Sequence, residues 1–215
     1  MMFQAPFIVL DGIDGTGKST QCRLLLEWLH DRGIAAIRTN DPGGTPLGDQ
    51  VRSILLNKST RVTLRGEALL FMASRAELVE QIIRPSLANG IVVVSDRFML
   101  SNVVYQAHAG GLDPEEIWKI GHFATCGLEP DITFLLDLPL DAAEARRDPD
   151  PDRFEVRGRE YHEKVREGFL YEAGHHPEKI EIVDAGMPIN ALQSLLRERI
   201  MGLLRQRGFR LPNGV

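Results

Sequence analysis

The glycine-rich segment Gly12–Ser19, with the sequence GIDGTGKS, constrains this chain more than any other feature. It matches the pattern G-x-x-x-x-G-K-[ST], a loop whose glycines let successive backbone N–H groups converge on phosphate oxygens. The positive N-terminal end of the following helix adds to this anion site. In the same pattern Lys18 reaches the β- and γ-phosphates, and Ser19 ligates Mg²⁺. The segment therefore predicts a nucleoside triphosphate site between a strand and a helix.

The apolar patterns on both sides of the loop predict an α/β domain. The run Phe7–Leu10 precedes the loop, and residues 19–30 follow it with a helical stripe of Cys22, Leu25, Leu26 and Leu29. Further apolar runs recur at 34–39, 91–94, 132–136 and 180–183. Continuous rather than alternating apolar runs are typical of parallel strands covered on both faces. Strands that alternate with helical segments indicate βαβ units.

Two other segments carry clear helical signals. Asp113 is expected to cap a helix that starts at Pro114, with Glu116 closing a capping box and Leu112 packing on Ile117. Near the C-terminus the helical period places leucines on one stripe, which predicts a core-facing helix. The residues of that stripe are Leu192, Leu195, Leu196, Arg199, Leu203 and Leu204.

Length and composition limit the classes of protein that need to be considered. A chain of 215 residues fits one domain. Its 25 Lys and Arg against 30 Asp and Glu give a net charge of −5, which argues against a nucleic-acid binder. No apolar run approaches the roughly 18 residues of a membrane helix, and the N-terminus lacks the pattern of a signal peptide. With only two cysteines, Cys22 and Cys126, we expect a cytoplasmic protein with free thiols and no membrane partner.

An acidic and a basic residue follow the third apolar run, at the end of a strand where ligands gather in open α/β sheets. Asp96 could hold a Mg²⁺-bound water, and Arg97 could clamp a second phosphate with two hydrogen bonds. A salt bridge at the strand end is the structural alternative for this pair.

Two polar segments need a separate interpretation. Residues 57–60, Asn-Lys-Ser-Thr, begin like the guanine-reading motif of GTPases, but Thr60 is not acidic and no strand precedes the segment, so we expect a polar loop. Residues 146–153 contain two prolines and therefore cannot form a regular helix. We expect an exposed loop there, flanked by Arg146, Arg147 and Arg153.

Six motifs, taken in order, make the chain resemble the bacterial thymidylate kinase family. The resemblance covers the chain from Phe7 to about Leu204, and it depends on the joint order and spacing of the motifs. The motifs are Asp11–Thr20, Asp41–Thr45, Leu70–Arg75, Asp96–Phe98, Ser101–Gln106 and Asp152–Glu155.

The resemblance implies a three-layer fold with a five-stranded parallel sheet flanked by helices. It implies a single kinase domain over residues 1–215, with a mobile lid at about 146–157. It also implies that ATP and Mg²⁺ are used to phosphorylate dTMP in dTTP biosynthesis, and that the protein is a homodimer. The residues expected to bind the ATP phosphates are Gly12, Asp14, Gly15, Thr16, Gly17, Lys18, Ser19 and Thr20.

The resemblance also implies a site for thymine. Phe71 would stack on the base, Arg75 would bind its polar edge, and Asn102 and Gln106 would complete its recognition. Without the resemblance, Phe71 fits a core position, and the two amides fit ordinary loop or helix-surface positions. Phe71 and Arg75 lie one helical turn apart, which suits a flat base with polar edges.

Sugar and phosphate recognition follows from the same resemblance. Tyr105 would crowd the 2′ position and favour deoxyribose, Asp14 would bind the 3′-hydroxyl, and Arg97 would hold the 5′-phosphate of the acceptor. The acceptor is already an anion, so the reaction needs alignment and charge neutralisation rather than a strong base. The residues expected to act in catalysis are Lys18, Asp96, Arg97, Arg147 and Arg153, with Ser19 and (through water) Asp96 at the metal.

The chain departs from the family pattern at several positions. Asn40-Asp41 stand where the family often has Arg-Glu, so a contact made by that cation would be lost or supplied elsewhere. Asp11 replaces a common Glu before the phosphate loop. Gly15 occupies a position that is Arg in some members, so lid arginines are expected to act on the transferring phosphoryl group instead.

Two other functions are compatible with the motifs. The chain could phosphorylate another nucleoside monophosphate or a deoxynucleoside, although a purine reader would need polar groups different from the Phe71, Arg75, Asn102 and Gln106 set. It could also be a regulatory nucleotide-binding module, against which the intact Lys18 and the Asp96-Arg97 pair argue.

Overall fold

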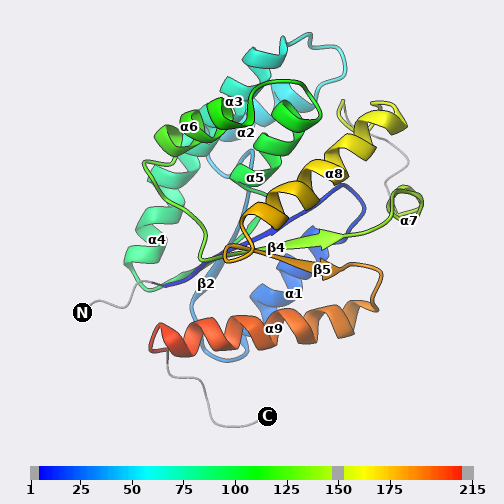
Figure 1. The fold of residues 1–215 in the computed structure, drawn as a ribbon. Helices are drawn as coiled ribbons and strands as arrows, with labels where there is room; N and C mark the ends of the chain where they lie inside the picture. The colour runs from blue at the N-terminus through cyan, green and yellow to red at the C-terminus, as the bar shows by residue number, and fades with distance from the viewer. Residues whose placement is uncertain (1–4, 147–152, 210–215) are drawn as a thin grey trace.

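The computed structural model describes residues 5–146 and 153–209, and its centre is a five-stranded parallel sheet (Figure 1). The strand order is β2-β3-β1-β4-β5, and every neighbouring pair is parallel. The predicted α/β fold is thereby confirmed. The strands are β1 (Phe7–Asp11), β2 (Ala36–Asn40), β3 (Val92–Asp96), β4 (Ile132–Asp137) and β5 (Ile180–Asp184).

Helices cover both faces of the sheet. Helices α1 and α9 lie on one face, and α3, α5, α6 and α8 lie over the other (Figure 1). The α-helices are α1 (Lys18–His30), α2 (Pro46–Leu56), α3 (Leu64–Leu78), α4 (Arg84–Ala88), α5 (Met99–Asn102), α6 (Pro114–Ala124), α7 (Leu140–Glu144), α8 (Arg159–His175) and α9 (Ile189–Gln206). The π-helical segments are η1 (Val79–Ile83) and η2 (Val103–His108).

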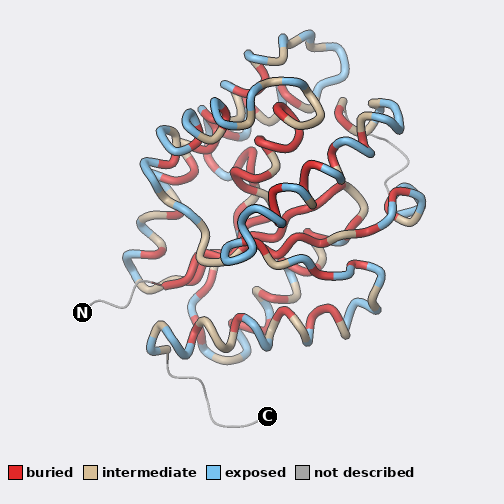
Figure 2. Tube along the Cα trace, viewed as in Figure 1, coloured by how far each residue is buried: buried red, intermediate tan, exposed pale blue. Residues whose placement is uncertain are grey.

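Strand β1 shows why its apolar run is continuous. Ile8 and Leu10 pack into the cluster that contains α1 and α9, whereas Phe7 and Val9 pack into the cluster that contains α3 and η1. Successive side chains of a strand point to opposite faces, so burial of both faces requires apolar residues at every position. The central strands are accordingly buried throughout (Figure 2).

The expected helix start at Pro114 and its Asp113 cap are confirmed, but the cap bonds the N–H of Glu115 and not that of Glu116, which a capping box closed by Glu116 requires. The Asp113 carboxylate accepts a hydrogen bond from the Glu115 N–H at 2.9 Å, and Pro114 opens α6. Residues 57–60 form the expected polar turn after α2, in which Asn57 Oδ1 accepts from the Ser59 N–H at 2.9 Å. On α9 the leucine stripe faces the core, with Leu192, Leu196 and Leu204 buried.

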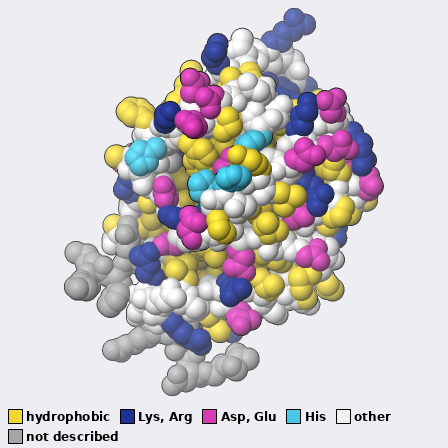
Figure 3. Space-filling view, in the orientation of Figure 1, with side chains coloured by type: hydrophobic (Ala, Val, Ile, Leu, Met, Phe, Trp, Pro, Cys, Tyr) yellow, Lys and Arg dark blue, Asp and Glu magenta, His cyan; other side chains and the backbone are white. Residues whose placement is uncertain are grey.

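The surface mixes charges of both signs. Acidic and basic side chains are interspersed over the face shown in Figure 3. Within residues 5–146 and 153–209, no helix is both long enough and apolar enough to cross a bilayer.

The packing of α8 against η2 generates a prediction about stability. A Cβ at Gly168 would lie 2.7 Å from the Cβ of His108, so Gly168→Ala must push the two helices apart. We expect a loss of about 1–3 kcal/mol in the free energy of unfolding, the usual effect of overpacking. Urea denaturation of the purified variant measures it.

The matched control is Gly202→Ala, inside α9, where a Cβ meets no heavy atom within 4 Å. There we expect a gain of about 0.5–1 kcal/mol, because alanine loses less backbone entropy in a helix. A Gly168→Ala variant as stable as the parent protein would show that the α8–η2 contact is not close-packed.

Candidate active site

The phosphate loop connects β1 to α1 and can be built only from glycine at two positions. Gly12 and Gly15 have φ angles of 137° and 88°, in the region that favours glycine. A Cβ would lie 2.5 Å from the Leu136 carbonyl oxygen at the first position and 2.2 Å from the Ala143 carbonyl oxygen at the second. The close approach of α7 therefore excludes an arginine at position 15.

Lys18 folds back into the curl of the loop. Its Nζ donates to the Gly12 and Ile13 carbonyl oxygens at 3.0 and 2.7 Å. Burial, and then the positive charge of Arg97, lower the pKa of Lys18 to about 8, although nearby carboxylates oppose the shift. The loop carbonyls thus hold this ammonium group where phosphates would replace them as partners.

Ser19 and Asp96 meet at the start of α1 and the end of β3. The Ser19 hydroxyl donates to Asp96 Oδ2 at 2.5 Å, which leaves the lone pairs of Ser19 Oγ for a cation. Asp41, from the loop after β2, lines the same cleft, and its Oδ1 is buried without a hydrogen-bond partner. In the described part of the chain no three His, Cys, Asp or Glu side chains cluster as a metal cage. A hydroxyl with nearby carboxylates fits Mg²⁺, which keeps waters and binds mainly through nucleotide phosphates.

Arg97 lies at the junction of several segments. Its backbone is left-handed, with φ of 68°, an uncommon conformation for a residue other than glycine. The guanidinium group pairs with the Asp14 carboxylate, and it donates to the Gly12 carbonyl at 2.8 Å and the Ser101 hydroxyl at 2.9 Å. It also lies 3.3 Å from the hydroxyl of Tyr105. The structure thus brings together Asp14, Arg97 and Tyr105, the residues that the resemblance assigns to the sugar and phosphate of the acceptor.

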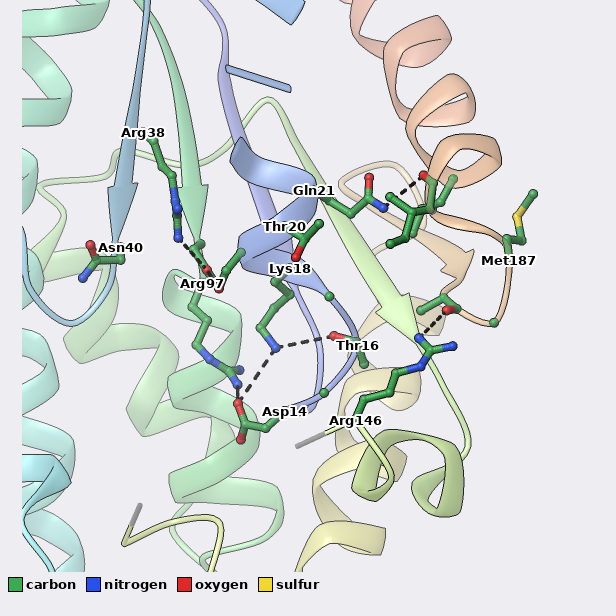
Figure 4. A pocket seen from close by; sticks show the side chains of 18 of the residues that line it. Asp14, Thr16, Lys18, Thr20, Gln21, Arg38, Asn40, Arg97, Arg146 and Met187 are labelled. Carbon is green, nitrogen blue, oxygen red and sulfur yellow. Dashed lines mark hydrogen bonds and ion pairs between the residues drawn. The ribbon is translucent and has the colours of Figure 1, made fainter. Parts of the chain in front are cut away.

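Two cavities meet at this arginine. The larger, of about 970 Å³, is lined by the phosphate loop, by Arg38, Asn40 and Asp96 at the strand ends, and by Arg146 (Figure 4). The smaller, of about 120 Å³, is lined by Phe71, Arg75, Asn102, Tyr105 and Gln106, among others. Four residues line both cavities, namely Asp14, Asp41, Arg52 and Arg97.

A chain of hydrogen bonds joins the polar residues of the smaller cavity. Arg75 is fully buried, and its Nε donates to Asp41 Oδ2 at 2.5 Å while Nη1 donates to Asn102 Oδ1 at 3.0 Å. Asn102 donates to Gln106 Oε1 at 2.7 Å, and Gln106 donates to Glu67 Oε1 at 2.9 Å. Burial raises the pKa of Asp41, and the positive charge of Arg75 opposes that shift. The polar side chains predicted to read the base, Arg75, Asn102 and Gln106, are therefore held in one network.

Arg146 and Arg153, near the two ends of the expected lid, lie in different surroundings. Arg146 lines the larger cavity and donates to the Ala185 carbonyl at 3.0 Å. Arg153 instead pairs with Glu67, 2.7 Å away, and donates to the Leu55 carbonyl at 2.8 Å. In this arrangement Arg153 lies beside the smaller cavity, so its expected action on the phosphoryl group would require it to leave Glu67. Arg147 lies outside the described residues.

Sequence reasoning missed several residues of the site. Glu67 binds Gln106 and both Arg153 and Arg157, and its spacing from Phe71 and Arg75, one and two helical turns on, could have revealed it. Arg38, which lies two residues before Asn40 on β2, lines the larger cavity. Arg52 on α2 lines both cavities, and only the folded chain brings it there.

Comparison with known proteins shows which family the chain belongs to. The sequence model of the family described as thymidylate kinase matches residues 10–196. The chain is 44% identical over 203 residues to a thymidylate kinase of Symbiobacterium thermophilum, which covers 94% of this chain and 95% of the relative. It is 43% identical over 196 residues to that of Clavibacter sepedonicus, covering 90% and 93%. It is 38% identical over 198 residues to that of Neisseria meningitidis serogroup C, covering 91% and 96%.

These matches extend over nearly the whole chain and include both the phosphate loop and the residues of the smaller cavity. They confirm the resemblance on which the residue assignments depend, and they decide between a dTMP kinase and the alternatives that the motifs left open. The chain therefore belongs to the thymidylate kinase family and, as a P-loop nucleotide kinase, phosphorylates dTMP to dTDP in nucleotide biosynthesis.

Proposed function

We propose that ATP binds in the larger cavity and dTMP in the smaller one, so that the two nucleotides meet at Arg97. The observation that carries this proposal is the set of four residues, Asp14, Asp41, Arg52 and Arg97, that lines both cavities. A phosphoryl group that passes from one nucleotide to the other must cross the place that the two binding sites share.

The donor site follows from the phosphate loop. The backbone N–H groups of the loop and the N-terminal end of α1 face the cavity and hold the β- and γ-phosphates. The Lys18 ammonium group exchanges the Gly12 and Ile13 carbonyl oxygens for the γ-phosphate. The adenosine extends toward Met187 and Leu192, where the cavity wall is more apolar, beside Arg146.

The acceptor site follows from the smaller cavity. Phe71 stacks on thymine, and Arg75, Asn102 and Gln106 offer polar groups to its edge. Tyr105 packs against C2′ of the sugar, with its hydroxyl 3.2 Å from Asp14 Oδ2. Arg97 exchanges its present carboxylate partner for the 5′-phosphate of dTMP, since a guanidinium group binds either anion with paired hydrogen bonds.

We further propose that Ser19 holds Mg²⁺, with Asp96 and the free Oδ1 of Asp41 accepting hydrogen bonds from its waters. When bound, the ion neutralises charge on the β- and γ-phosphates. The buried, unpartnered oxygen of Asp41 supports this assignment, because an isolated buried acceptor is otherwise costly.

Catalysis in this arrangement consists of alignment and charge neutralisation. An oxygen of the dTMP phosphate attacks the γ-phosphorus in line, the bond to the ADP oxygen breaks, and ADP leaves with the electron pair. Lys18 and Arg97 supply fixed positive charge on the two sides of the transferring group. Segment 146–157 acts as a lid that excludes water, and we propose that Arg146, Arg147 or Arg153 moves over the phosphoryl group as it closes.

We also propose a homodimer. Exposed apolar side chains lie on α2, α3 and α6, and α3 contacts both of the other helices. Leu47 and Ile54 share one face of α2, and Ile120 and Phe123 share one face of α6, since residues three, four or seven apart lie close together on a helix. Packing this face on a second copy would remove the exposed apolar surface from water.

Location and domain organisation complete the proposal. Cys22 and Cys126 are both free, which suits a reducing compartment, so we propose that the protein acts in the cytoplasm. We treat residues 1–215 as one kinase domain, because elements from both ends of the described chain, α1 and α9, pack on the same face of one sheet.

Two substitutions separate the two proposed sites. Lys18→Ala should lower kcat by well over tenfold, because it removes a cation that acts on charge in the transition state. Phe71→Ala should raise KM for dTMP several-fold more than KM for ATP, because it removes the surface on which the base stacks. A coupled assay of ADP release, with each substrate varied in turn, measures both effects.

Tyr171→Ala serves as the control, since this exposed side chain lies outside both cavities and outside the proposed dimer face. Near-normal turnover in Lys18→Ala would contradict the proposed donor site. Equal effects of Phe71→Ala on the two substrates would place Phe71 in the core instead of at the base.

The lowered pKa of Lys18 predicts how nucleotide affinity depends on pH. Above about pH 8 most free protein carries a neutral Lys18, whereas the triphosphate binds the charged form. Binding must then take up a proton, so the affinity for ATP should fall as pH rises, by up to about tenfold per unit. Calorimetry in metal-free buffer from about pH 6.5 to about pH 9.5 measures the change.

Lys18→Met is the control for this titration. It should bind ATP weakly at every pH, without the decrease near pH 8, because no group at position 18 titrates. An affinity of the parent protein that stays constant up to about pH 9.5 would contradict the assignment.

Aspartate substitutions on the exposed apolar face of α2, α3 and α6 test the proposed dimer. Leu69→Asp and Phe123→Asp should convert a species of about twice 24.0 kDa into the monomer, because a carboxylate cannot be buried unpaired in an apolar interface. Sedimentation velocity measures the mass, with Tyr171→Asp on α8 as the exposed control. A parent protein that sediments as the monomer would refute the dimer.

A further inference from the structure

The larger cavity contains a cation that compensates for a departure noted in the sequence. Asn40 stands where the family often has arginine, and its Nδ2 donates to the Pro42 carbonyl oxygen at 3.0 Å. This neutral side chain therefore holds the loop backbone and brings no charge to the nucleotide. Two residues earlier on the same strand, Arg38 lines the same cavity and points toward the phosphate loop (Figure 4).

The contact that Arg38 makes is specific. Its Nη2 lies 3.3 Å from Asp96 Oδ2, the same oxygen that accepts the Ser19 hydroxyl at 2.5 Å. The Asp96 side chain is only 11% exposed, whereas that of Arg38, which lines the cavity, is 34% exposed. A partly buried carboxylate beside bound phosphates would repel them, and an arginine on that carboxylate offsets the repulsion.

The other arginines that line the described part of this cavity already have different partners. Arg97 is shared between Asp14 and the acceptor side, and Arg52 donates to the Pro42 carbonyl and lines both cavities. Arg146 donates to the Ala185 carbonyl, on the far side of the phosphate loop. Among these arginines, Arg38 is the one that pairs with Asp96, the carboxylate that accepts the Ser19 hydroxyl.

We infer that Arg38 supplies the nucleotide site with the positive charge that is absent at position 40, and that it does so by holding Asp96 in place for the donor phosphates. The inference rests on the proposed placement of ATP in the larger cavity. It makes Arg38 a positioning residue of the donor site, with no part in dTMP binding, because Arg38 does not line the smaller cavity.

The geometry also predicts which replacement works. Arg38 reaches Asp96 through a single nitrogen, without the paired hydrogen bonds that only a guanidinium group can form. Lysine at this position should therefore retain the function, whereas methionine, with a stem of similar shape and no charge, should not.

The test compares Arg38→Met, Arg38→Lys and the control Arg23→Met, an exposed arginine on α1 that pairs with Glu27. Calorimetry measures ATP affinity without turnover, and the coupled assay measures kcat and both KM values. For Arg38→Met we expect at least about fivefold weaker ATP binding and at least about tenfold lower kcat, with KM for dTMP within about twofold. Arg38→Lys should stay within about threefold of the parent protein, and Arg23→Met should match it.

Restoring the missing charge gives an independent measurement. The double variant R38M/N40R should recover most of the ATP affinity lost in R38M, since the cation returns at the position the family uses. A double variant no better than R38M would overturn the claim that Arg38 replaces a charge at position 40. Parent-like ATP affinity and kcat in R38M, or equal damage in R38K and R38M, would overturn the role of its charge.

These outcomes remain distinct from failure of the proposed function. If Lys18→Ala keeps normal activity, the donor site itself is misplaced. If Lys18→Ala loses activity while Arg38→Met does not, the donor site stands and only the role of Arg38 is refuted. Thermal unfolding of each variant shows whether a loss arises from the site or from the fold.

Discussion

The contact between Arg97 and the phosphate-loop region organises the whole site. The left-handed backbone of Arg97 at the end of β3 directs its guanidinium group to Asp14 and the Gly12 carbonyl. The same group also contacts Ser101 and Tyr105. Segments far apart in the chain therefore converge on one cation. Because β1 and β3 are adjacent parallel strands, their carboxyl ends meet at one edge, and the two cavities must also meet there.

Behind that junction a buried polar network joins the two cavities to Arg153. It runs from Asp41 through Arg75 and the two amides to Glu67, which holds Arg153. Each of these side chains has at least one hydrogen-bond partner within the network, which fixes the side chains in one arrangement. A base bound in the smaller cavity would change the partners of the same groups, so occupancy of that cavity and the position of Arg153 are physically connected.

The distribution of charge explains how an acidic chain binds two polyanions. The net charge is −5, yet Lys18, Arg38, Arg52 and Arg97 all line the larger cavity. Several of these cations already pair with carboxylates or carbonyl oxygens. Arg97 pairs with the carboxylate of Asp14, and Arg38 pairs with that of Asp96. Phosphates would exchange with these partners, so the site keeps its cations ordered before either nucleotide arrives, and little reorganisation is left for the reaction.

The sequence by itself determined the phosphate loop and the parallel sheet, because these depend on local spacing and on periodic burial. The residues proposed for the base site followed only from the family resemblance. The sequence could not determine which arginines reach the phosphates. Arg153 pairs with Glu67, which is 86 residues away in the sequence, and Arg38 pairs with Asp96, which is 58 residues away. A long arginine side chain has many rotamers, and the partner that selects one comes from a distant segment. Only the folded chain brings that partner within reach, so the tertiary structure decides where the cations act.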